Sequence, residues 1–212
     1  MRVIVMKIYQ DNLFPYSLSF IFKTYMVCIQ IIYVLKSNHI CFERCCVMEQ
    51  KKEEVRYWIE RLGMQPHPEG GYYSEVYRSE WWIPVEGMPA PRRVLTTIYY
   101  LLEDKAFSAF HRIKSPESWF FHKGMPLLIY SFEEGKLICR ELSDREEGSL
   151  QVTIEPGIWF AARLKGQKGF TLVSCAVAPG FEFEDFELAD RKDLLDGYPE
   201  HEAVILGLTR QK

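Results

Sequence analysis

Apolar side chains recur at helical spacing between residues 49 and 62. They stand at positions i, i+3, i+4 and i+7, which places them on one face of a helix. The four residues are Val55, Trp58, Ile59 and Leu62. Gly63 follows, at a place where a glycine commonly ends a helix. This pattern predicts one amphipathic helix before the rest of the fold.

After residue 71 the pattern changes to short runs rich in β-branched and aromatic residues, separated by turn residues. Such runs are typical of strands. The predicted strands are Tyr72–Arg78, Val94–Leu102, Ala106–Ile113, Ser118–His122, Pro126–Phe132, Lys136–Leu142, Leu150–Ile154, Ile158–Ala162 and Phe170–Ala178. The segment Glu133–Lys136 predicts a hairpin turn. Many short strands without helices between them indicate a β-sandwich or barrel.

Two helical patterns close the sequence, at Asp185–Leu195 and Glu200–Leu208. The expected fold class is therefore mainly β, with one N-terminal helix and short C-terminal helices. The acidic run between Glu182 and Glu187 alternates with phenylalanines, and this predicts a solvated strand or turn rather than a calcium loop.

The first 47 residues differ from the remainder. Their apolar stretch, Phe20–Leu35, is interrupted by polar residues and is shorter than the roughly 20 residues that a membrane-spanning helix needs. Met48 begins a sequence with the character of a soluble protein. We therefore predict that residues 1–47 are a non-domain extension, from an over-extended start or a disordered segment, and that residues 48–212 form a single domain. A weak membrane anchor is the alternative for the extension.

Composition narrows the classes of function. The net charge is −3, and no basic stripe interleaved with aromatic residues occurs, so we expect neither a nucleic-acid partner nor a membrane partner. The later part of the chain holds two widely spaced cysteines, Cys139 and Cys175. These predict free thiols and a cytoplasmic protein, with a disulfide between them as the open alternative. Neither a phosphate-binding glycine loop nor a nucleophile elbow is present.

Two segments carry the most informative spacing, one from His111 to Gly124 and one from Glu155 to Phe160. Together they resemble the two motifs of the cupin superfamily. The residues that keep the spacing of the motifs are His111, Glu117, Gly124 and Gly157. Ile113 and Phe160 stand where the superfamily has two further histidines.

Dispersed segments between about residues 55 and 210 also resemble one subfamily of small, RmlC-like cupins of unknown function, the "cupin type 5" proteins. These segments are 62–73, 96–102, 107–112, 159, 175–183 and 208–210. The resemblance implies a cupin-type jelly-roll β-barrel, a homodimer, and a pocket inside the barrel that takes a small-molecule ligand.

A cupin metal site uses three histidines and one glutamate, and only His111 and Glu117 remain. Two ligands rarely hold a transition metal selectively, so we expect no metal and no other cofactor. His122 is a possible substitute, but on a regular strand it lies on the face opposite to Glu117.

The strand that contains His111 predicts which side chains face the pocket. Strict alternation places Phe107, Ala109, His111 and Ile113 on one face, expected to be the barrel interior. A buried histidine beside a carboxylate can act as a general base near neutral pH. We predict His111 and Glu117 as catalytic residues, with Glu117 orienting the imidazole. The predicted ligand-binding residues are Glu69, Tyr99, Trp119 and Phe160.

Three functions remain open from the sequence. The first is a metal-free isomerase or epimerase that acts on a carbohydrate or nucleotide sugar. In cupin epimerases a tyrosine often serves as the acid, and Tyr99 and Tyr130 are the candidates here. The second is a cupin that binds a small molecule without catalysis. The third is a metal-dependent cupin enzyme in which His122 or another group completes the ligand set.

Overall fold

A computed structural model describes residues 52–210 of the 212-residue chain. A helix over residues 52–61 precedes the strands, and α3 (Arg191–Gly197) and α4 (Glu202–Leu208) follow them. The strands are β1 (Gln65–Pro66), β2 (Tyr72–Arg78), β3 (Trp82–Ile83), β4 (Arg92–Arg93), β5 (Thr96–Glu103), β6 (Phe107–Ile113), β7 (Glu117–Gly124), β8 (Leu127–Glu133), β9 (Lys136–Leu142), β10 (Gln151–Ile154), β11 (Phe160–Leu164), β12 (Phe170–Val177) and β13 (Phe186–Leu188).

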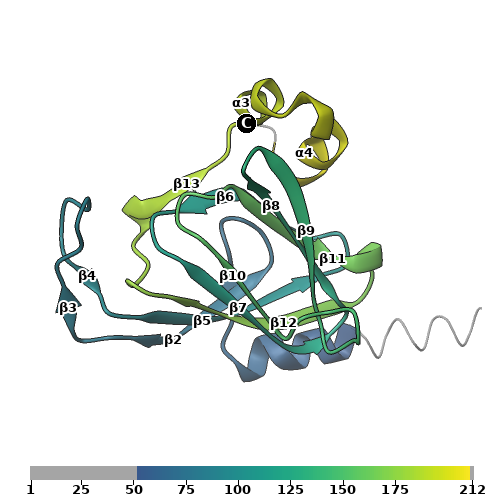
Figure 1. Cartoon of the computed structure of the whole chain (residues 1–212). Helices are drawn as coiled ribbons and strands as arrows, with labels where there is room; N and C mark the ends of the chain where they lie inside the picture. Colours follow the sequence, from purple (N-terminus) through teal and green to yellow (C-terminus); the bar gives the residue numbers. More distant parts are fainter. Residues whose placement is uncertain (1–51, 211–212) are drawn as a thin grey trace, which may run out of the picture. The chain divides into compact units, whose positions relative to one another are not determined.

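Two antiparallel sheets face each other and form a jelly-roll barrel (Figure 1). One has the order β1-β2-β5-β12-β7-β10 and the other the order β13-β6-β11-β8-β9. The main apolar core fills the space between them and includes Leu127, Ile129, Val173 and Phe160. The predicted mainly β jelly-roll fold is confirmed.

Helices cover the outer face of each sheet (Figure 1). Val55 of the first helix packs with Leu101 and Leu172 on the outer face of the six-stranded sheet. Ile205 and Leu208 of α4 pack with Phe110 on the outer face of the five-stranded sheet. The first helix therefore buries the apolar stripe that its sequence predicts.

The predicted hairpin at Glu133–Lys136 joins β8 to β9 with Glu134 and Gly135 as its two central residues. Both have positive φ, 50° and 76°, as a type I′ turn requires.

The prediction of one helix over Asp185–Leu195 is wrong in its first half. Residues Phe186–Leu188 instead form β13, which pairs with the edge of β6. The helix α3 starts only after Asp190, whose side chain accepts hydrogen bonds from the backbone N–H groups of Lys192 and Asp193. Pairing with an open sheet edge outweighs the local helical preference of these residues.

A second difference is the short ribbon of β3 and β4, which the sequence pattern did not predict. Its two-residue strands are too short to show an alternation. The ribbon extends beyond the barrel at the end that also carries β13 (Figure 1).

A β-bulge in β6 changes which side chains face the interior. Opposite β11, Ser108 pairs with Ala162 and His111 pairs with Phe160, so two residues of β6 oppose the single residue Ala161. Ser108 and His111 therefore face the same side although they are three positions apart. The prediction that Phe107 shares the inner face with His111 is wrong for this reason, and Phe107 packs with the outer cluster under the C-terminal helices.

The predicted non-domain extension, residues 1–47, lies outside the described residues. Within residues 52–210, no helix has the length and apolar character needed to cross a membrane. Cys139 is exposed and Cys175 is buried, and the two form no disulfide bond with each other.

Candidate functional site

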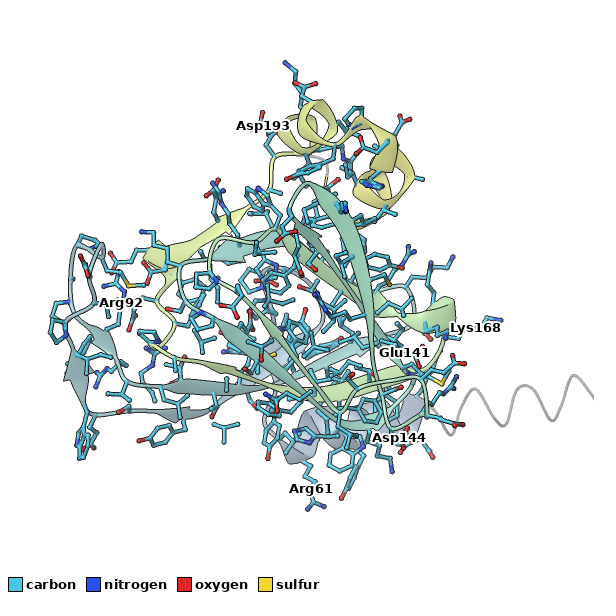
Figure 2. All side chains as sticks on the ribbon, in the orientation of Figure 1. Arg61, Arg92, Glu141, Asp144, Lys168 and Asp193 are labelled. Atoms are coloured by element: carbon cyan, nitrogen blue, oxygen red, sulfur yellow. The ribbon has the colours of Figure 1, made fainter. Side chains whose placement is uncertain are left out.

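A cavity of about 300 Å³ lies inside the barrel. This volume is at the small end of the range for ligand pockets, about 300–1,000 Å³. Figure 2 shows side chains of both sheets projecting into the space between them. The residues that line the cavity are Gln65, His67, Glu69, Tyr73, Glu75, Arg78, Thr96, Ile98, Tyr100, His111, Ile113, Glu117, Trp119, Cys175, Val177, Phe181 and Phe183.

The register of the six-stranded sheet arranges much of this lining in cross-strand rows. Ile98, Cys175 and Trp119 lie side by side on β5, β12 and β7. Thr96, Val177 and Glu117 form the next row. Alternation along each strand thus delivers every second side chain to the cavity wall.

His111 projects from β6 and has only 3% of its surface exposed. Its Nδ1 lies 2.8 Å from the carbonyl oxygen of Ala109. Because a carbonyl oxygen can only accept, Nδ1 must carry the hydrogen. In the neutral ring Nε2 is then the acceptor, and no described residue forms a hydrogen bond with Nε2. The imidazole therefore offers a lone pair for a ligand.

Glu69 is the carboxylate that contacts this histidine. Its Oε2 lies 3.4 Å from His111 Nδ1 and accepts a hydrogen bond of 2.7 Å from Ser108 Oγ. The resulting chain, Ser108 to Glu69 to His111, orients the ring and would stabilise a positive charge on it. Glu69 lies in the cavity wall, and its predicted role in ligand binding stays a prediction.

Two glycines seat the loop that carries Glu69. Gly70 and Gly71 have φ values of 122° and 70°. A Cβ atom at Gly70 would lie 2.4 Å from the Phe107 carbonyl oxygen, and one at Gly71 would lie 2.4 Å from that of Leu101. Only residues without a side chain let the loop approach both strands this closely.

Glu117 lines the same cavity but no contact joins it to His111 among the described residues, so the predicted orienting role belongs to Glu69 instead. Burial first, and the nearby charge of Glu69 second, raise the pKa of Glu117 from 4.5 to about 8. Contacts with Cys175 and Trp119 act in the opposite direction. Glu117 is therefore a neutral carboxylic acid near pH 7, able to donate a hydrogen bond.

The other predicted ligand-binding residues fall in three places. Trp119 lines the cavity. Phe160 is not among the lining residues; its ring packs against that of His111 with centroids 4.1 Å apart. Tyr99 lies on the outer face of β5 and packs with the cluster under the first helix, so its prediction as a pocket residue is wrong. Its neighbour Tyr100 faces the cavity instead, because successive side chains of β5 point to opposite faces of the sheet and the even-numbered ones point inward.

Tyr130, the other tyrosine considered as an acid, is also outside the cavity. It belongs to the cluster under the C-terminal helices, and its hydroxyl accepts a hydrogen bond from Arg163.

The residues of the site that were not predicted as functional include His67, Tyr100, Ser108 and Cys175. Tyr100 could have been found from alternation, because it shares a face of β5 with Thr96 and Ile98. His67 stands two positions before Glu69 in the same loop, which is a signal that was available. The inward face of Ser108 depends on the bulge in β6, and no local sequence pattern marks it.

An antiparallel double-sheet barrel that encloses a cavity, with a histidine and a glutamate projecting into it from consecutive strands, defines the cupin class of protein. The model of a family described as "Cupin superfamily (DUF985)" matches residues 56–189. The chain belongs to this family.

The chain is also similar to three other proteins. The chain is 29% identical over 164 residues to the uncharacterized protein YML079W of Saccharomyces cerevisiae, covering 70% of this chain and 81% of that protein. A hypothetical protein from Leishmania major has a solved structure with a TM-score of 0.69 and 36% identity, covering 74% of this chain and 98% of that one. Protein SO0799 from Shewanella oneidensis has a TM-score of 0.66 and 38% identity, covering 73% and 96% respectively.

The donor set of this cavity does not fit the metal centre of cupins. Ile113 and Phe160 place hydrocarbon at two of the four ligand positions. Within residues 52–210, no three His, Cys, Asp or Glu side chains gather as metal ligands. His122 cannot complete such a set, because it is exposed on the outer face of β7 and hydrogen-bonds Ser174.

Proposed function

We propose that this cupin binds a small polar molecule in its barrel cavity and catalyses an isomerisation or epimerisation by proton transfer at carbon. The observation that carries the proposal is the orientation of His111. Its Nδ1–H is held by Ala109 and Glu69, which leaves Nε2 as a base in an enclosed cavity. Histidine is the side chain most often used as a general base.

In the proposed reaction Nε2 of His111 takes a proton from a carbon atom next to a carbonyl group. The electron pair of the broken C–H bond forms a C=C bond, and the carbonyl oxygen takes a proton from a neutral acid. Glu117 is that acid, because its raised pKa keeps it protonated. The His111 imidazolium then gives its proton to the former carbonyl carbon, while the hydroxyl group on the first carbon gives its proton to the Glu117 carboxylate and becomes the new carbonyl group. Both residues return to their starting protonation states, and the product is an isomer of the substrate. Glu69 stabilises the imidazolium that exists between the two steps.

The alternative function is binding without turnover. The contacts of Glu69 with Ser108 and His111 favour it, because the same contacts would form if these residues only held the ligand site in place. Under this alternative a ligand raises the melting temperature and no product forms.

The test is turnover of His111→Gln in a screen of aldoses, ketoses and nucleotide sugars, with incorporation of solvent deuterium at carbon as the readout. We expect loss of exchange by at least about 100-fold, the lower range for removal of a general base. His122→Gln is the matched control, because its imidazole is exposed on the outside of the barrel. Wild-type exchange rates in His111→Gln would refute the proposal.

A further inference from the structure

His67 is a second imidazole in the cavity, at the start of the loop that carries Glu69. Its ring is held edge-on against Tyr73 and Tyr100, with centroids 4.7 Å and 5.5 Å away. Its Nδ1 accepts a hydrogen bond of 3.2 Å from the backbone N–H of Glu69. A ring nitrogen that accepts carries no hydrogen, so the hydrogen of His67 is on Nε2.

The two imidazoles of the cavity therefore have opposite polarity. His111 carries its hydrogen on Nδ1 and presents an acceptor, whereas His67 carries its hydrogen on Nε2 and presents a donor. No described residue accepts a hydrogen bond from Nε2 of His67. A half-buried donor without a protein partner is suited to an oxygen atom of a ligand.

The charges around the cavity exclude one class of ligand. Arg78 is the only arginine or lysine among the described lining residues. Its guanidinium is already bound to Glu75 at 2.8 Å and to Glu182 at 2.9 Å. Burial lowers the pKa of His67, opposed by Glu69, and nearby His111 and Arg210 lower it further, so this ring adds no positive charge at pH 7. A phosphate or carboxylate group would enter beside Glu69 with no free cation to balance it.

We propose that the cavity selects an uncharged hydroxy-carbonyl compound, such as an unphosphorylated sugar, and that His67 Nε2–H binds its carbonyl oxygen. This inference rests on the proposed function and defines its substrate class. The donors His67 and Glu117 suit a carbonyl oxygen, and the acceptor His111 suits the neighbouring carbon and its hydroxyl group. The small volume of the cavity accommodates one ring or a short chain.

The first experiment measures the tautomers by ¹⁵N NMR of the full chain with labelled histidine at pH 7.5. The chain has five histidines, and the variants His67→Gln and His111→Gln assign the two signals. We expect protonation of Nε2 in His67 and of Nδ1 in His111. The same tautomer in both rings, or a doubly protonated His67, would overturn the proposed role of His67.

The second experiment measures binding by calorimetry of three- to six-carbon aldoses and ketoses, each with and without a terminal phosphate. The uncharged sugars should bind and the phosphorylated ones should bind at least about tenfold more weakly. His67→Phe should lose about tenfold in affinity, the equivalent of one hydrogen bond. His67→Gln, whose amide can donate from a similar position, should restore most of it. His122→Phe is the control and should bind as the wild type does.

Tighter binding of the phosphorylated sugars, or failure of every uncharged sugar to bind, would overturn the substrate class. Unchanged affinity in His67→Phe would remove His67 from ligand binding. These outcomes are distinct from failure of the proposed function, which is measured by deuterium exchange in His111→Gln.

Discussion

Glu117 shows how burial decides the chemical state of a single residue. Glu117 is 8% exposed, and no arginine or lysine among the described residues affects its pKa, so the charged form is the costly one. Its sequence context, a glutamate at the start of a strand, gives no sign of a pKa near 8. The position of Glu117 in the pocket was predictable from the cupin spacing, but its protonation was not, because that depends on Glu69 from a distant loop.

The raised pKa of Glu117 predicts a pH dependence of stability. Between pH 4.5 and about 8 the folded state holds a proton that the unfolded state releases. The contribution of Glu117 to the free energy of unfolding should therefore be largest below pH 4.5. It should fall as the pH rises through this window, by up to about 1.4 kcal/mol per pH unit. Glu117→Gln removes the titration, so its stability relative to wild type should rise from pH 5 to pH 8.5.

Urea denaturation of both proteins at several pH values measures this difference. Glu155→Gln, a substitution at an exposed residue beside the same strand pair, serves as the control and should follow the wild type. A constant difference between Glu117→Gln and wild type across the window would contradict the prediction.

At the scale of elements, the segment at the mouth of the cavity is fixed by ion pairs. Phe181 and Phe183 line the cavity just before the buried Asp185. Asp185 forms two hydrogen bonds with Arg92 of β4, at 2.6 Å and 2.9 Å. Figure 2 labels Arg92 at the end of the molecule where β3 and β4 lie. The ribbon therefore holds one wall of the ligand site.

Asp185→Asn should destabilise the fold, because it leaves the buried guanidinium of Arg92 with only the more exposed Glu184 as a counter-charge. We expect a loss of about 3 kcal/mol, the lower end of the range for a broken buried pair. Glu187→Gln is the matched control, since its pair with Arg112 is largely exposed and should cost less than about 1 kcal/mol. Chemical denaturation at pH 7 measures both, and equal losses would contradict the prediction.

Most strands were predictable from the sequence, because period-2 patterns and turn residues are local signals. The structure of the acidic run between Glu182 and Glu187 was not predictable in this way. Its pattern indicated a solvated face, yet Asp185 is only 5% exposed and pairs with Arg92, which is 93 positions away. The partner lies in a ribbon whose strands are two residues long, too short to leave a periodic pattern. Elements held by distant ion pairs and edge pairing therefore escaped prediction, whereas those with an amphipathic face did not.

For the whole molecule, the predicted homodimer remains a prediction with a specific surface. Exposed apolar side chains gather on β2 and the ribbon beside it. They are Val76 (53% exposed), Tyr77 (50%), Trp81 (78%) and Trp82 (53%). Adjacent exposed aromatic residues at one edge of a sheet are typical of interfaces between subunits.

The double variant Val76→Ser, Trp81→Ser should therefore shift the protein from dimer to monomer at micromolar concentration, because it removes apolar surface from the proposed interface. Analytical ultracentrifugation measures the change. Leu150→Ser is the control: Leu150 is 63% exposed but lies beside β10, at the other edge of the same sheet from β2. A monomeric wild type, or a dimeric double variant, would contradict the prediction.

The extra residue in β6 affects more than the direction of side chains. A chain shortened by one residue at Ala109 would keep Ser108 and His111 on the inner face, now two positions apart as in a regular strand. It would also lose the Ala109 carbonyl oxygen that accepts from His111 Nδ1, which would leave Glu69 as the acceptor for this nitrogen. One of the two acceptors that fix the neutral form of the ring thus depends on the number of peptide units in one strand, which a comparison of side-chain identities does not reveal.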